Sequence, residues 1–193
     1  MKFEITKFES VTSTNDVAIN LIQKKKKEKG YIYSYAQTNG RGQYGKKWIS
    51  QKGNLFGSIF FQLKKHYPSF SEFSMINPVI ISDVVKYFCK GKNISIKWPN
   101  DIFINEKKVC GILQELITSN SKKFLIVGIG INIVSSPNFK DKYQATNIFL
   151  ETKKKPLISD IVSLTISSYE KFFYNLKTYR YKDYKKKANL ITL

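Results

Sequence analysis

Residues 97–113, KWPNDIFINEKKVCGIL, constrain the fold more than any other stretch of the chain. A short β-prone run at 94–98 ends at Pro99, which has no backbone donor and a fixed φ. Two apolar runs follow, at 102–104 and 109–113, and the residues between them are polar. This pattern predicts a β-hairpin that follows a short strand.

Polar side chains crowd onto the same hairpin. Lys97 and Lys108 are cationic, Asn100 is an amide and Asp101 is a carboxylate. A hairpin with only a structural role rarely needs such a group, so we interpret the stretch as a site for an anionic ligand.

A second feature is the glycine-rich stretch TNGRGQYGKKW at residues 38–48, with three glycines in six residues. Such spacing disfavours helix and strand and allows consecutive backbone amides to face a ligand. A flexible surface loop would have the same glycines. The interleaved Arg41, Lys46 and Lys47 favour phosphate binding.

The rest of the chain predicts a mixed α/β protein. Alternating or buried apolar runs predict strands at 2–8, 31–36, 53–63 and 124–133. Helical periodicity predicts helices at 73–88 and 158–176, and a short lysine-rich helix within 179–193. A further helix should begin at Ser13 or Thr14 and end at Gly30. Residues 135–142 read as a polar loop.

Composition excludes several classes of protein. The chain has 193 residues, which suits a single domain, and it has neither a signal-like N-terminus nor a long apolar span. Cys89 and Cys110 lie in apolar patterns, which indicates reduced core thiols and a cytoplasmic protein. His66 is the lone histidine and should be exposed, so histidine triads and histidine-based zinc sites are not expected.

The formal net charge is +19, and all but two of the 33 basic residues are lysines. Such a charge would suit nucleic acid or an acidic protein partner. The chain is also rich in Ile, Asn, Tyr and Phe, as expected from an AT-rich coding sequence, so we treat much of the charge as compositional background. A basic nucleic-acid-binding module remains an alternative of a different class.

Five motifs in order resemble those of the biotin protein ligases. They are STN at 13–15, QTNGRGQYGKKW at 37–48, KWPND at 97–101, KVCGIL at 108–113 and GIGIN at 128–132. The resemblance covers roughly residues 10–150. It implies a mixed β-sheet with helices mainly on one face, similar to class II aminoacyl-tRNA synthetases. A lipoate ligase or octanoyltransferase, which shares this fold and a central lysine, is the nearest alternative.

The resemblance also implies an activity. Members of the family activate biotin with MgATP to biotinyl-5′-AMP and pass the biotinyl group to one lysine of a biotin carboxyl carrier protein domain. The expected cofactor is therefore Mg²⁺ with ATP, biotin is a substrate, and the metal ligands are unknown. No specific DNA binding and no membrane association are expected, and the protein should be a monomer or weak homodimer.

By resemblance, Lys108 and Arg41 are the expected catalytic residues. The expected biotin-binding residues are Ser13, Thr14, Asn15, Gln37, Gly40, Arg41, Gly42, Gln43, Lys108, Gly111 and Gly128. The expected ATP-binding residues are Gln43, Lys46, Trp48, Asn100, Asp101, Lys108 and Asn132.

The chain departs from the family in its glycine-rich loop, where Gln43 and Lys46 stand in place of the arginines of many relatives. Glutamine keeps hydrogen bonding but brings no charge. We expect residues 1–193 to form one catalytic domain, without an N-terminal winged-helix domain or a C-terminal SH3-like domain. A monofunctional ligase without repressor activity is the corresponding expectation.

Overall fold

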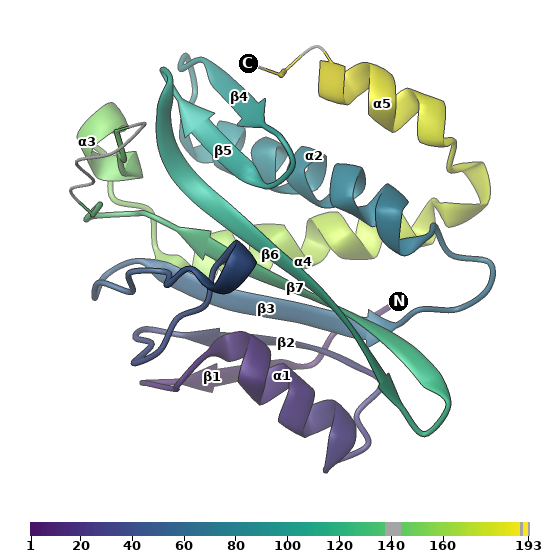
Figure 1. Cartoon of the computed structure of the whole chain (residues 1–193). Helices are drawn as coiled ribbons and strands as arrows, with labels where there is room; N and C mark the ends of the chain where they lie inside the picture. Colours follow the sequence, from purple (N-terminus) through teal and green to yellow (C-terminus); the bar gives the residue numbers. More distant parts are fainter. Residues whose placement is uncertain (138–143, 190, 193) are drawn as a thin grey trace.

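The structure is a computed structural model that describes residues 1–137, 144–189 and 191–192. Within these residues, seven strands form one mixed sheet in the order β1-β2-β3-β7-β6-β5-β4 (Figure 1). The strands are β1 Ile5–Phe8, β2 Lys29–Ser34, β3 Leu55–Gln62, β4 Ile94–Lys97, β5 Asp101–Ile104, β6 Lys107–Ser119 and β7 Lys122–Ile131. Only the β1–β2 pair is parallel among the paired strands that the structure describes.

The helices are α1 Thr14–Gln23, α2 Phe70–Phe88, α3 Ile148–Thr152, α4 Ile158–Tyr174 and α5 Tyr181–Asn189, with short 3-10 turns η1 Gln43–Gly45 and η2 Leu176–Thr178. Helix α1 packs on one face of the sheet, whereas α2 and α4 cover the opposite face and α5 packs against α2 (Figure 1). Among the described residues, no helix is long and apolar enough to cross a membrane.

The alternation of side chains along β7 explains the two faces. Leu125 and Val127 belong to the large core beneath α2 and α4, while Phe124 and Ile126 belong to a smaller core beneath α1. The predicted mixed sheet with helices mainly on one face is confirmed.

The predicted hairpin is present, but one of its strands is longer than expected. β5 and β6 pair antiparallel around Asn105 and Glu106, whose φ angles of 47° and 65° are those of a type I′ turn. β6 then continues to Ser119, well past Leu113, because its second half pairs with β7 along its whole length. The apolar pattern marked only the buried part of the strand.

The predicted helix from Ser13 to Gly30 is wrong at its C-terminal end. α1 ends at Gln23, Lys26 has a φ of 53°, and Gly30 lies inside β2. Gly30 is needed there because a Cβ atom would lie 2.7 Å from the Phe60 ring. Most of the expected polar loop at 135–142 lies outside the described residues. His66 is exposed, and both cysteines are buried free thiols, as predicted.

Candidate active site

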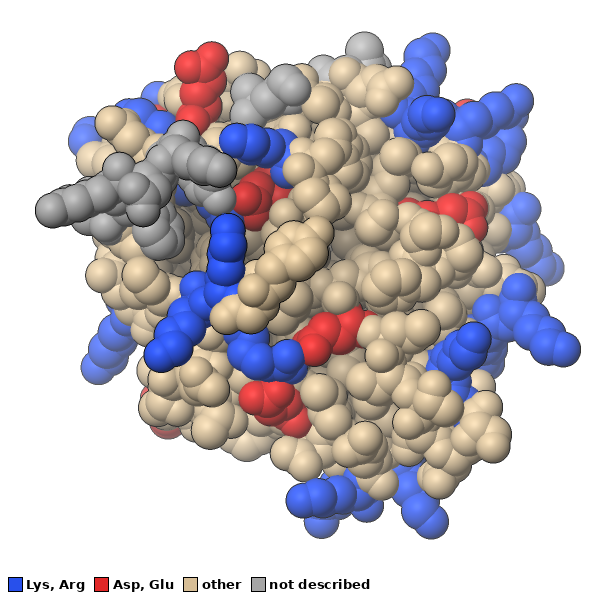
Figure 2. Space-filling model, in the orientation of Figure 1, with Lys and Arg blue, Asp and Glu red and all other residues tan. Residues whose placement is uncertain are grey.

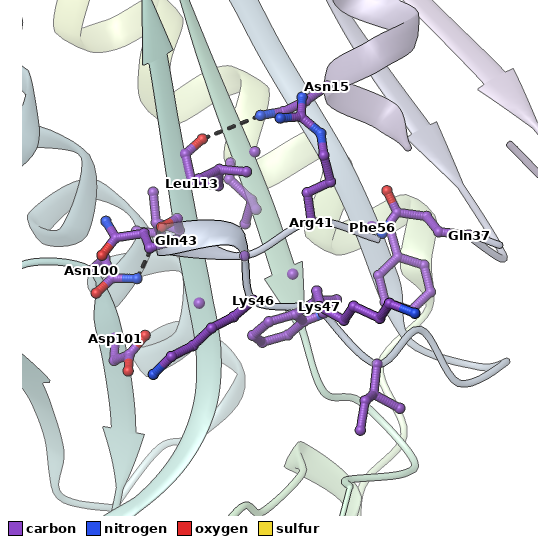
Figure 3. Close-up of a pocket in the computed structure, with 18 of the residues that line it drawn as sticks. Asn15, Gln37, Arg41, Gln43, Lys46, Lys47, Phe56, Asn100, Asp101 and Leu113 are labelled. Atoms are coloured by element: carbon purple, nitrogen blue, oxygen red, sulfur yellow. Dashed lines mark hydrogen bonds between the residues drawn. The ribbon is translucent and has the colours of Figure 1, made fainter. Parts of the chain in front are cut away.

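A cleft of about 470 Å³ opens on the α1 face of the sheet, beside the glycine-rich loop (Figure 3). The stripe of β7 that carries Phe124 and Ile126 under α1 continues as Gly128, Gly130 and Asn132, which line the cleft. Their neighbours in register are Ser58 on β3 and Gly111 on β6. The cleft forms because large side chains give way to glycines on β7 and β6 and to a serine on β3 along this face.

Trp48 fills part of the space left by two of these glycines. Gly111 and Gly130 are paired in register, and a Cβ atom on either would lie 2.5 Å from the Trp48 indole. The indole therefore lies flat against backbone and forms an aromatic wall of the cleft. Among the described residues, its buried Nε1 has no hydrogen-bond partner, so the donor is available to a ligand.

A polar network lines the α1 end of the cleft. The Gln37 Oε1 atom accepts from the Thr14 amide at 2.8 Å, and its Nε2 donates to Ser50 at 3.0 Å. The Ser58 hydroxyl lies 2.8 Å from Thr14 Oγ1 and 2.5 Å from Asn15 Oδ1. Fixed donors and acceptors of this kind suit a small polar ring, because burying a polar ligand without partners is costly.

The opposite part of the cleft is cationic. Lys108 Nζ lies 2.8 Å from Asp101 Oδ1 and 5.4 Å from the centre of the Trp48 ring, and both members of the ion pair are largely buried. Figure 3 shows Lys46 extending toward Asp101, whereas Lys47 runs toward Phe56. Among the described residues, Asn132 Oδ1 is buried without a hydrogen-bond partner, which leaves an acceptor for a ligand.

The glycine-rich stretch folds as a small turn rather than as a flexible loop. The Gly42 amide donates to the Lys46 carbonyl at 2.6 Å, and the Trp48 amide donates to the Gly40 carbonyl at 2.9 Å. Its tip is Tyr44, which has a φ of 56° and is 92% exposed. The backbone hydrogen bonds of this turn therefore place four side chains at the cleft, those of Arg41, Gln43, Lys46 and Trp48.

Arg41 is held by two carboxylates. Its Nη1 and Nη2 atoms donate to the two oxygens of Glu115 at 2.7 and 2.8 Å, and Nη2 also lies 2.8 Å from Asp16 Oδ1. Burial alone would lower the pKa of the guanidinium, but the bonds and charges of Glu115 and Asp16 raise it above its ordinary value. Arg41 therefore does not present an isolated positive charge to the cleft.

The structure brings together the expected biotin-binding and ATP-binding residues except Gly40, and Lys97 of the predicted anion site also does not line the cleft. Ser13, Thr14, Asn15, Gln37, Arg41, Gly42, Gln43, Lys46, Trp48, Asn100, Asp101, Lys108, Gly111, Gly128 and Asn132 line the cleft. Gly40 lies behind it, where a Cβ atom would meet Ser50 and the Trp48 carbonyl at 2.6 Å.

Sequence reasoning missed several residues at the site. Phe56 and Ala145 also line the cleft, and Glu115 and Asp16 bind Arg41. No sequence signal connects Glu115 to Arg41.

The described residues contain no group of three or more histidine, cysteine or acidic side chains that could hold a metal ion. Burial raises the pKa of the Cys89 thiol to about 12 and that of Cys110 further. Neither thiol is a candidate nucleophile at neutral pH.

The sheet order and the cleft beneath the glycine-rich turn define the fold of biotin protein ligase catalytic domains. The Aquifex aeolicus biotin protein ligase in complex with biotin and ATP superposes with a TM-score of 0.82 at 28% identity, over 98% of this chain and 78% of that chain. The Leishmania major enzyme in complex with biotinyl-5-AMP gives 0.84 at 26% identity, over 98% and 81%. Residues 7–132 match the model of the biotin/lipoate A/B protein ligase family, and the chain belongs to this family.

Among curated relatives, the bifunctional ligase/repressor BirA of Bacillus subtilis is 29% identical over 179 residues, which is 90% of this chain. The chain spans about half, 52%, of the length of that relative.

Proposed function

We propose that this protein is a biotin protein ligase, with residues 1–193 forming a single catalytic domain. It would activate biotin with MgATP to biotinyl-5′-AMP and transfer the biotinyl group to a lysine of a biotin carboxyl carrier protein domain. The observation that carries the proposal is a single cleft with a polar network at one end, the Trp48 wall beside it and Lys108 and Lys46 at the other. Similar chains have been solved with biotin, ATP and biotinyl-5-AMP bound.

The polar end of the cleft suits the ureido ring of biotin. That ring presents a carbonyl acceptor and two N–H donors, and the network of Thr14, Asn15, Gln37 and Ser58 offers both kinds of partner within one buried cluster. Gly128 allows this fit, because a Cβ atom there would lie 2.5 Å from Asn15 Oδ1. The apolar body of biotin would lie against the Trp48 indole, which itself covers Gly111 and Gly130.

The first step would join two anions. A biotin carboxylate oxygen attacks the α-phosphorus of ATP, a bond forms between them, and the bond from that phosphorus to the bridging oxygen breaks as pyrophosphate leaves with the electron pair. Lys108 would neutralise charge on the carboxylate and α-phosphate while Asp101 fixes its position at 2.8 Å. Catalysis of this kind comes from positioning and electrostatic stabilisation.

The second step would transfer the biotinyl group. The neutral amine of a carrier lysine attacks the carbonyl carbon of the adenylate, the carbon–oxygen bond to phosphate breaks, AMP leaves and the amine loses a proton. No covalent enzyme intermediate is needed, in keeping with the raised pKa of both thiols. A carrier domain as the acceptor of the biotinyl group is part of this proposal.

Mg²⁺ would enter with ATP and spread the negative charge of its phosphates. A protein needs to supply only one or two oxygen ligands to Mg²⁺ when phosphates and water supply the others. The Asp101 carboxylate and the Asn132 amide oxygen, both in the cleft, fit that requirement.

Two assays test the proposal. Purified protein should release pyrophosphate from MgATP only in the presence of biotin, and transfer with release of AMP should require a carrier domain as well. Lipoate should not substitute for biotin. The solved neighbours with substrates bound are biotin ligases, which disfavours the lipoate alternative. The nucleic-acid alternative requires sequence-dependent affinity beyond a steep salt dependence. Absence of biotin-dependent pyrophosphate release would refute the proposed function.

A further inference from the structure

Arg41 ties the glycine-rich turn to two other elements of the fold. Glu115 belongs to the half of β6 beyond the hairpin, and Asp16 lies in the first turn of α1. The three contacts, at 2.7, 2.8 and 2.8 Å, include a bidentate pair with Glu115. Charge-assisted bidentate pairs of this type are roughly twice as strong as neutral hydrogen bonds and fix orientation.

One of the two carboxylates, Glu115, is also connected to the polar end of the cleft. Asn15 Nδ2 donates to Glu115 Oε2 at 2.6 Å and lies 3.4 Å from the Leu113 carbonyl (Figure 3). Glu115 therefore holds both Arg41 and Asn15, and its side chain is only 24% exposed. Partly buried ion pairs are screened less by salt than surface pairs are.

The charge balance argues against Arg41 as the main contact of an anionic ligand. One guanidinium faces two carboxylates, so the cluster carries a formal charge of about −1. An anion that displaced Glu115 would have to break two charge-assisted bonds and leave a half-buried carboxylate without its partner. Lys46 and Lys108 also bring positive charge to the cleft, Lys108 as the partner of Asp101 at 2.8 Å. The face of the molecule in Figure 2 shows the same mixture, with acidic side chains beside basic ones near its middle.

We propose that Glu115 and Asp16 are positioning residues that act through Arg41 to hold the glycine-rich turn over the cleft. We call the cluster of Arg41, Glu115 and Asp16 the clasp, because it connects this turn to β6 and α1. The clasp keeps Trp48 against Gly111 and Gly130 and keeps Gln43 and Lys46 at the cleft. This assignment differs from the expectation by resemblance that Arg41 is a catalytic and biotin-binding residue. Its consequence for biotin affinity rests on the proposed function.

The first test needs no ligand. Hydrogen exchange of the Gly42 and Trp48 amides, which are bonded within the turn, reports how often the turn opens. In Glu115→Gln the exchange of both amides should be about tenfold faster, and Arg41→Gln, which also loses the contact with Asp16, should give at least that increase. The double variant should be no faster than Arg41→Gln alone, because the Arg41–Glu115 contact is already lost in that variant. Glu28→Gln is the matched control, since Glu28 pairs with Lys122 at 2.6 Å near the other end of β3.

The second test is the sign of the change in ligand binding. A clasp predicts that Glu115→Gln weakens biotin binding and raises the KM for biotin and ATP by about tenfold, with kcat changed much less. If instead Glu115 merely withholds Arg41 from the ligand, the same variant should bind biotin more tightly. The charge-reversed pair Arg41→Glu with Glu115→Arg should recover part of the loss.

Tighter binding in Glu115→Gln, or unchanged exchange of the two amides, would overturn the proposal. A wild-type protein that binds no biotin would refute the proposed function instead, while the exchange measurement would still decide whether the clasp exists.

Discussion

Gly130→Ala gives a sharp test of the Trp48 wall. The new Cβ atom would lie 2.5 Å from Trp48 Cε2, 2.6 Å from Nε1 and 2.7 Å from Cζ2. These atoms form one edge of the indole, so rotation about a single contact cannot relieve the clash. Ordinary carbon contacts lie near 3.5–4 Å, so the ring must move by about 1 Å. Trp48 is half-buried, which lets it retreat toward solvent.

A displacement of about 1 Å at a ligand-binding wall can cost about 100-fold in rate, or about 2.7 kcal/mol of transition-state stabilisation. We therefore expect kcat/KM for biotin-dependent pyrophosphate release to fall by about two orders of magnitude in Gly130→Ala. The assay follows pyrophosphate under varied biotin and ATP, and circular dichroism confirms that the variant is folded.

The control is Gly30→Ala, whose Cβ atom would meet the buried Phe60 ring at 2.7 Å away from the cleft. That variant should lose stability but, once folded, keep normal KM values. Adding Trp48→Phe to Gly130→Ala should restore part of the activity, because a smaller ring relieves the clash. If folded Gly130→Ala protein has a kcat/KM within about threefold of wild type, Trp48 does not form a functional wall of the cleft.

Four further outcomes follow. Lys108→Ala should slow adenylate formation by about 100-fold or more in a pyrophosphate assay, with a smaller loss of biotin affinity, because a preorganised cation acts mainly in the transition state. Transfer to an acidic carrier should slow between low and moderate salt while adenylate formation changes little, if the surface lysines steer the carrier. Gln43→Arg should slow dissociation of preformed adenylate by about tenfold, or ~1.4 kcal/mol, in an off-rate measurement. Glu72 accepts hydrogen bonds from Ser69, and these bonds lower the pKa of the Glu72 carboxyl. The stability that the ionised carboxylate adds is therefore present at neutral pH and is lost as pH falls through the pKa of Glu72 in the folded protein. The difference in Tm between wild type and Glu72→Ala should accordingly shrink in acid.

Local patterns were sufficient to predict most of the sheet and helices. Buried runs such as FLIVGIGINI identify β7 because apolar strands in a covered sheet are continuous, and α2 and α4 show clear helical periodicity. The second half of β6 was not predicted because Glu115 interrupts the apolar run, although pairing with β7 continues there. The helix end was misplaced because a lysine run is compatible with a helix, a turn or a strand start.

The candidate site shows the same difference between what local patterns predict and what depends on distant contacts. Motifs placed on short loops and strand ends, such as KWPND and the glycine-rich turn, could be assembled into a cleft because sheet pairing brings them together. The partners of a side chain depend on which distant strand passes beside it. Arg41 and Glu115 are 74 residues apart, and their contact depends on the full length of β6.

That dependence explains why the contacts of Arg41 with Glu115 and Asp16 could not be predicted from its motif. An arginine between glycines suggests an anion site because a guanidinium binds carboxylates and phosphates equally well. In this fold the nearest carboxylates belong to the protein, from β6 and α1, and they occupy the fork at 2.7 and 2.8 Å. The motif therefore identifies the chemistry of the contact, while the paths of β6 and α1 decide that its partners are Glu115 and Asp16.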